Sequence, residues 1–172
     1  MTERKINIKV VLRISYLLLM IASLLASISL IYASAYASAY GGGDFSWIEL
    51  IWVWKGIVAT FIFSAIAFIA LKKPNKTGVY FSYSIPIGIG VYFLITFINS
   101  TFYDFEKGVE LNFEYITGKI IEPILIIGIP WLLILGARKL EVANFQFKKI
   151  DYGITFGLTA TLFFFWYFMF KY

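Results

Sequence analysis

The chain has 172 residues, of which 60% are hydrophobic, 20% aromatic and only 15% charged, with a formal net charge of +5. A soluble domain usually carries roughly 25% charged residues, so this composition cannot cover a water-facing surface and predicts an integral membrane protein. The chain contains no cysteine and no histidine, which excludes disulfides, thiol nucleophiles, iron–sulfur ligation and the usual zinc and general-base chemistry. We therefore expect no metal, no cofactor and no enzymatic activity.

Five apolar runs are long enough to cross a bilayer, which takes about 20 mostly apolar residues. In chain order they cover residues 14–36, 47–71, 79–102, 119–137 and 152–170. The connections between them are short and leave no room for a separate soluble domain. The sequence therefore predicts a single all-α domain, a bundle of five transmembrane helices.

The first run starts after a basic segment and ends in a four-residue repeat that puts Tyr32, Tyr36 and Tyr40 on one helix face. This predicts a helix that continues past the membrane surface until the glycines at 41–43 end it. The extension would serve as a docking surface or lie on the second helix. The basic start and the Ala-Ser-Ala sequences also resemble a signal peptide. However, the apolar stretch exceeds the roughly 7–15 residues of a signal h-region, so we expect an uncleaved anchor.

The second and fifth runs carry small residues at helical spacing. Gly56, Thr60 and Ser64 are each four residues apart, and Gly153 and Gly157 form a G-x-x-x-G pattern. Lipid tails are as apolar as leucine, so membrane helices associate by close approach over small side chains. These faces predict helix packing, either within one bundle or with another subunit.

The third and fourth runs contain residues that interrupt helices: Pro86, Gly88 and Gly90 in the third, and Pro123 and Pro130 in the fourth. Proline removes a backbone donor and bends a helix, so the freed carbonyl needs another partner. We expect kinks that serve packing. Transporters use broken helices to bind ions, which is the alternative, although the two halves show no inverted repeat.

The distribution of charge predicts the orientation of the helices. Eleven of the 15 basic residues lie in the N-terminal segment, the second-to-third connection and the fourth-to-fifth connection, whereas the other connections are acidic or neutral. Because Lys and Arg concentrate on the cytoplasmic side, we expect a cytoplasmic N-terminus and an external C-terminus. Trp54 and Trp166, near the outer ends of their runs, are expected to belong to aromatic belts at the interface.

Two charged residues fall within the apolar runs, Lys55 in the second and Glu122 in the fourth. An ionisable residue in a membrane span is a functional candidate by default. Glu49 and Asn99 are expected at a similar depth, so the four residues predict a polar cluster in the outer leaflet, with a Lys55–Glu122 ion pair. The cluster would be a structural pair, a binding site for an ion, proton or lipid headgroup, or a contact with a partner subunit.

These observations predict a multi-pass protein of the cell membrane, with a composition typical of a bacterial cytoplasmic membrane protein. We expect a non-catalytic accessory or assembly subunit of a larger membrane complex. Its partners would be membrane lipids and other membrane subunits or copies of itself, and no nucleic acid. A small autonomous transporter or channel that uses the outer-leaflet cluster is the alternative. An enzyme acting on a lipid-linked substrate, with Glu122 or Glu49 as base, is a third hypothesis with less support.

Overall fold

A computed structural model describes residues 7–41, 47–73, 75–109 and 113–168, with the backbone alone for 37, 38, 41, 47–53 and 114. The regular secondary structure of the described residues is entirely α-helical, which confirms the predicted all-α class. It forms α1 (Ile8–Gly41), α2 (Trp47–Ala70), α3 (Lys76–Glu106), α4 (Phe113–Asn144) and α5 (Lys149–Tyr167).

Three of these helices are long and apolar enough to cross a membrane: α1 over Ile8–Tyr36, α3 over its whole length, and α4 over Tyr115–Asn144. In α2 the apolar segment within the residues whose side chains are described is Trp54–Ala70. Helices α1, α3 and α4 extend beyond both ends of the predicted apolar runs, whereas α2 follows its run closely and α5 is shifted toward the N-terminus. For example, α4 begins at Phe113 instead of residue 119, because polar residues at its ends continue the same backbone hydrogen-bond pattern.

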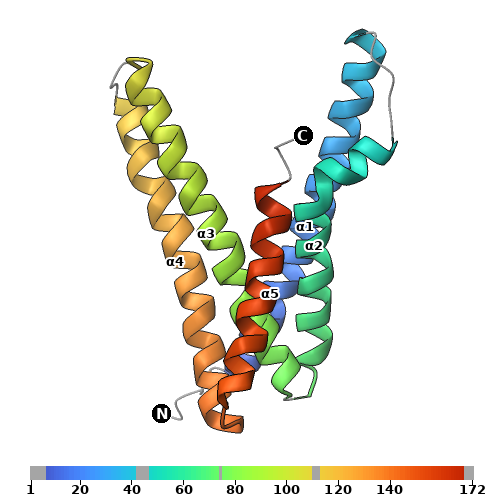
Figure 1. The fold of residues 1–172 in the computed structure, drawn as a ribbon, viewed down its shortest axis with the longest axis vertical. Helices are drawn as coiled ribbons and strands as arrows, with labels where there is room; N and C mark the ends of the chain where they lie inside the picture. Colours follow the sequence, from blue (N-terminus) through green and yellow to red (C-terminus); the bar gives the residue numbers. More distant parts are fainter. Residues whose placement is uncertain (1–6, 42–46, 74, 110–112, 169–172) are drawn as a thin grey trace, which may run out of the picture.

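The helices form two arms with the last helix between them (Figure 1). α1 packs along α2 in one arm, and α3 packs along α4 in the other, while α5 contacts both α3 and α2. The arms meet at the end where α2 and α4 finish, which we call the convergent end. They diverge at the end where α1 and α3 finish, which we call the open end.

The convergent end collects the basic segments that were predicted to share one side of the membrane. Lys9 at the start of α1, Lys76 at the start of α3 and Lys148 before α5 all lie there, whereas Asp104 and Glu106 lie near the open end. Antiparallel helices joined by short connections produce this separation, because every second connection falls on the same side.

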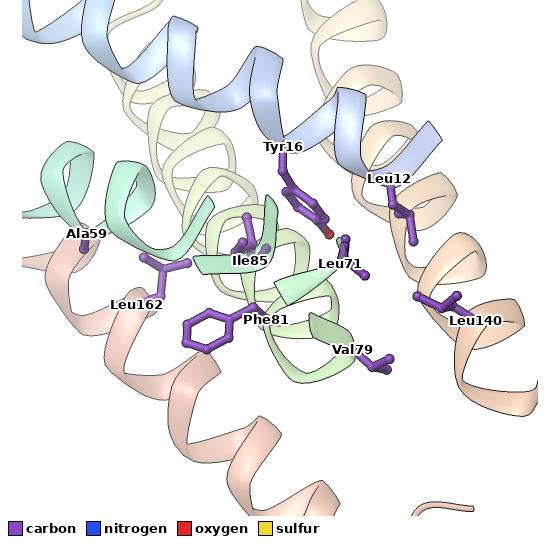
Figure 2. Packing of buried hydrophobic residues seen from close by; sticks show 10 residues of the cluster. Leu12, Tyr16, Ala59, Leu71, Val79, Phe81, Ile85, Leu140 and Leu162 are labelled. Carbon is purple, nitrogen blue, oxygen red and sulfur yellow. The ribbon is translucent and has the colours of Figure 1, made fainter. Parts of the chain in front are cut away.

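The apolar core lies mainly toward the convergent end and draws on every helix (Figure 2). Its members are Leu12, Tyr16, Ala59, Ala67, Leu71, Val79, Phe81, Ile85, Leu140 and Leu162. α3 is its central element, since it contacts α2, α4 and α5. Among the described residues, the largest fully buried side chain is Tyr16 of α1, which points its hydroxyl toward α3.

Gly88 and Gly90, which were expected at kinks that serve packing, allow close helix packing within one helix from Lys76 to Glu106. A Cβ at Gly88 would lie 3.1 Å from the Thr159 carbonyl oxygen of α5, and a Cβ at Gly90 would lie 3.1 Å from Cγ of Pro130 in α4. Both distances are tighter than ordinary van der Waals contact. The absence of a side chain therefore lets α3 approach both neighbours closely.

Pro86 receives the compensation that a proline inside a helix requires. It has no N–H to donate to the Ser82 carbonyl one turn earlier. The Tyr16 hydroxyl donates to that carbonyl at an O···O distance of 3.0 Å, and both Tyr16 and Ser82 are fully buried. The contact ties α1 to α3 at the position where the internal helix bond is missing.

The tryptophans expected in interfacial belts are partly used inside the bundle. Trp54 is buried, and the Trp166 indole N–H donates to Oγ1 of Thr60 at 2.8 Å. The Trp166 ring also lies 5.2 and 5.4 Å from the rings of Tyr92 and Phe93, measured between centroids. Trp166 therefore joins α5 to both α2 and α3, because its hydrogen-bond donor and its apolar rings face different neighbours.

Candidate functional site

The two charged residues predicted to pair lie in different arms. Lys55 is on α2, with its Nζ 5.9 Å from the centre of the Phe168 ring that follows α5. Glu122 is exposed on α4. The ion pairs between described residues are Lys76–Asp151 and Lys119–Asp104, so the structure does not bring Lys55 and Glu122 together. The physical reason is the packing order, because α3 and α5 lie between their helices (Figure 1).

The other two members of the predicted cluster belong to α2 and α3. Glu49 belongs to α2, but its side chain lies outside the described residues, and Asn99 is exposed on α3. Glu122 borders a groove of about 400 Å³ between α3 and α4 whose walls include Ile89, Phe93 and Leu125. Because Phe93 also contacts Trp166 of α5, the groove faces the space between the arms.

The two predicted packing faces have different surroundings. Gly56, Thr60 and Ser64 are all buried in the bundle, where Thr60 accepts the indole hydrogen bond described above. By contrast, a Cβ added at Gly153 or Gly157 of α5 would meet no atom within 4 Å. The first face is filled by neighbouring helices, and the second is open.

Polar side chains gather instead at the convergent end, around two carboxylates. Glu141 near the end of α4 is 9% exposed, and Asp151 in the first turn of α5 is 3% exposed. Both face tyrosines from the first turns of α3, Tyr80 and Tyr83. Together with Tyr152, we call these residues the tyrosine–carboxylate site.

Asp151 accepts three hydrogen bonds, two of them on the same oxygen. Its Oδ1 accepts the Tyr80 hydroxyl at 2.5 Å, and its Oδ2 accepts Nζ of Lys76 at 2.9 Å and the backbone N–H of Lys148 at 2.6 Å. The Lys148 amide, then the Tyr80 hydroxyl and Lys76, lower the pKa of Asp151 to about 2. This carboxylate therefore stays ionised, caps α5 and fixes the start of α5 to the start of α3.

Glu141 is held differently, by neutral donors. Its Oε2 accepts the Tyr83 hydroxyl at 2.5 Å, and its Oε1 accepts the Tyr152 hydroxyl at 3.2 Å. No described cation lies within ion-pair distance of it. The Phe147 ring packs against the rings of both Tyr83 and Tyr152, and this packing orients the two hydroxyls that bind Glu141.

A pocket of about 470 Å³ adjoins Glu141. Tyr83, Tyr152 and Arg138 supply its polar wall, and Ile87 and Val142 belong to its apolar wall. This size is within the usual range of roughly 300–1,000 Å³ for small-molecule sites, which also combine apolar walls with a few placed polar groups. The pocket can therefore bind a ligand through charge and hydrogen bonds.

This site was not predicted from the sequence, because the charged residues of the fourth-to-fifth connection were interpreted only as evidence for the orientation of the helices. A usable signal was present: Glu141 and Asp151 are acidic residues in an otherwise basic connection. Tyr80 and Tyr83, three residues apart, also share one face of α3. What the sequence does not contain is the adjacency of α3, α4 and α5 that brings these groups together.

A second polar cluster joins α3 to α4 at the open end. Nζ of Lys119 lies 2.9 Å from Oδ2 of Asp104 and also donates to the hydroxyls of Ser100 and Thr101, at 3.2 and 3.3 Å. The Tyr115 hydroxyl donates to the same Asp104 oxygen at 3.2 Å. All donors and acceptors come from α3 and α4, so the cluster holds these two helices together at the open end.

Comparison with protein-family models, with curated proteins and with solved structures finds no match to this chain.

Proposed function

We propose that the chain is a non-catalytic accessory or assembly subunit of a larger membrane complex, in a bacterial cytoplasmic membrane. In this proposal all five helices cross the membrane, the N-terminus is cytoplasmic and the C-terminus is external. The clustering of Lys and Arg at the convergent end supports the orientation, because such residues favour the cytoplasmic side.

The observation that carries the proposal is the divergence of the two arms (Figure 1). The bundle leaves its apolar helices largely uncovered: only 11% of the most apolar window of α1 and 6% of that of α4 is buried. The open glycine face of α5 contrasts with the filled face of Gly56, Thr60 and Ser64. A neighbouring transmembrane helix can approach such a glycine face more closely than it can approach leucine-rich surfaces.

The test is extraction of the tagged protein from its native membrane in a mild detergent, followed by sizing and mass spectrometry of everything that co-purifies. We expect a stoichiometric complex. Gly157→Leu should release the partner, whereas Gly118→Leu, at an equally open glycine of α4, should not. A wild-type protein that elutes alone, as a monomer or homo-oligomer, would count against a subunit role.

A second candidate function is transport, because the groove beside Glu122 faces the space between the arms and places a carboxylate among apolar side chains. Purified protein in liposomes should then move a cation or small solute, and Glu122→Gln should reduce the flux. Glu106→Gln, at an exposed carboxylate near the end of α3, is the matched control. Liposomes that show no flux across a broad panel of ions and solutes would remove this candidate.

A further inference from the structure

The pocket at the convergent end contains a carboxylate whose charge no described residue matches with an ion pair. A carboxylate has about four acceptor positions, and Glu141 uses two of them for the hydroxyls of Tyr83 and Tyr152. The side chain is nine-tenths buried, and the side-chain donors that the structure gives it are two neutral hydroxyls. An ammonium group placed in the pocket would use the remaining acceptor positions and balance the charge.

The same pocket has a cation on its wall, which limits the ligands that fit. Arg138 is three residues before Glu141 on α4, so the two side chains lie on neighbouring positions of one helix face and both line the pocket. A guanidinium presents several donors in a planar fork that suits a phosphate. A simple cation would pair with Glu141 but be repelled by Arg138. A simple anion would pair with Arg138 but be repelled by Glu141. A ligand that carries both charges a few bonds apart satisfies both residues.

Two apolar residues complete one side of the pocket, next to Thr155, and this side opens outward. Val142 is 76% exposed, and Ile87 is half-buried beside it. The pocket therefore connects the charged pair with the apolar outer surface of α3 and α4. In the proposed orientation this end lies at the level of the lipid headgroups of the inner leaflet.

We infer that this pocket binds an aminophospholipid, with the phosphate on Arg138, the primary ammonium on Glu141 and the acyl chains along Ile87 and Val142. The tyrosines position the carboxylate, and their rings border the headgroup. This site is additional to the proposed subunit role, which requires no specific lipid.

The decisive test compares headgroups on the wild-type protein in a neutral detergent, by native mass spectrometry with phosphatidylethanolamine, its N-methylated derivatives, phosphatidylcholine and phosphatidylglycerol. A quaternary ammonium cannot donate hydrogen bonds to Glu141. A charge-assisted hydrogen bond contributes about 1.5–3 kcal/mol, so phosphatidylethanolamine should bind about tenfold or more tightly than phosphatidylcholine. Soluble phosphoethanolamine, which lacks acyl chains, should bind far more weakly than the lipid.

Two variants separate the contributions of the charged residues. Glu141→Gln should abolish the preference for the primary amine, and Arg138→Gln should weaken binding of both zwitterionic lipids by a similar factor. Lys139→Gln, the same kind of charge change beside the pocket, should leave binding unchanged. If Glu141→Gln does not fold, the wild-type headgroup series and Arg138→Gln still decide.

Three results would overturn the inference: equal binding of all headgroups, tighter binding of phosphatidylcholine, or tighter binding of phosphatidylglycerol than of both zwitterionic lipids. The last result would make the pocket an anion site that depends on Arg138 alone. Soluble phosphoethanolamine that binds as tightly as the lipid would overturn the role of the acyl chains. None of these results bears on co-purification of a partner subunit, so the two proposals fail independently.

Discussion

Removing the hydroxyl of Tyr16 should destabilise the protein through a single backbone carbonyl. Tyr16→Phe keeps the buried ring but deprives the Ser82 carbonyl of its donor at 3.0 Å. Pro86 cannot replace that donor, and both Tyr16 and Ser82 are fully buried, so no water reaches the site. Leaving a buried acceptor unsatisfied costs about 1–3 kcal/mol, and hydrogen bonds between membrane helices average less, so we expect a loss of about 1–2 kcal/mol.

A change at Pro86 tests the role of this carbonyl directly. Pro86→Ala introduces an N–H that can donate to the Ser82 carbonyl within α3. In that background, Tyr16→Phe should cost less than about 0.5 kcal/mol, which gives a coupling energy of about 1 kcal/mol between the two positions.

The assay is reversible unfolding by sodium dodecyl sulfate in mixed micelles, followed by tryptophan fluorescence, for the wild type, both single variants and the double variant. Tyr32→Phe is the matched control, because this hydroxyl is on the same helix but its side chain is 73% exposed. It should change stability by less than about 0.5 kcal/mol. An equal cost of Tyr16→Phe in the wild-type and Pro86→Ala backgrounds would refute the assignment of the hydroxyl to the proline's free carbonyl.

Three further predictions concern other contacts. Lys119→Met should destabilise the protein, because it deprives Asp104 of its 2.9 Å partner where the two side chains are 20% and 25% exposed. Hydrogen exchange at the end of α3 and the start of α4 should speed up, and unchanged exchange would contradict this. Trp166→Phe removes the 2.8 Å bond to Thr60 and should cost about 1 kcal/mol in the same unfolding assay; no loss would show that the bond does not stabilise the bundle. Hydrogen bonds, chiefly from a backbone amide, lower the pKa of Asp151 from 3.8 to about 2. Its contribution to stability is therefore complete above about pH 4 and is lost as the pH falls toward 2. Asp151→Asn should remove this part of the pH dependence, and identical pH profiles of variant and wild type would refute it.

The helical class and the position of the helices along the chain follow from the sequence, because a backbone in lipid must satisfy its hydrogen bonds internally. Apolar runs therefore identified each helix. They underestimated the ends of α4, where Phe113 and Asn144 continue the helix through polar residues. Side-chain polarity decides where a helix meets water, whereas backbone bonding decides where it ends.

The candidate site shows what periodicity and charge cannot provide. Lys55 and Glu122 were paired because they were expected at the same depth, but depth does not specify which helices are neighbours. The contact between Tyr83 and Glu141 joins residues 58 positions apart and depends on α3 lying beside the end of α4. The glycines of α3 were expected at kinks that serve packing, but their sequence signal is the same whether they bend the helix or let a neighbouring helix approach closely. Only the packed structure distinguishes these outcomes.

The central position of α5 has a consequence for the order of events during synthesis. It is the last of the five helices to leave the ribosome, yet its Leu162 is completely buried and Thr159 lies against Gly88 in the middle of the bundle. Until α5 has been made, Tyr80 and Lys76 lack the carboxylate that they bind in the folded protein. The two hairpins made first therefore lack their shared centre, and the fold closes only after translation has passed α5.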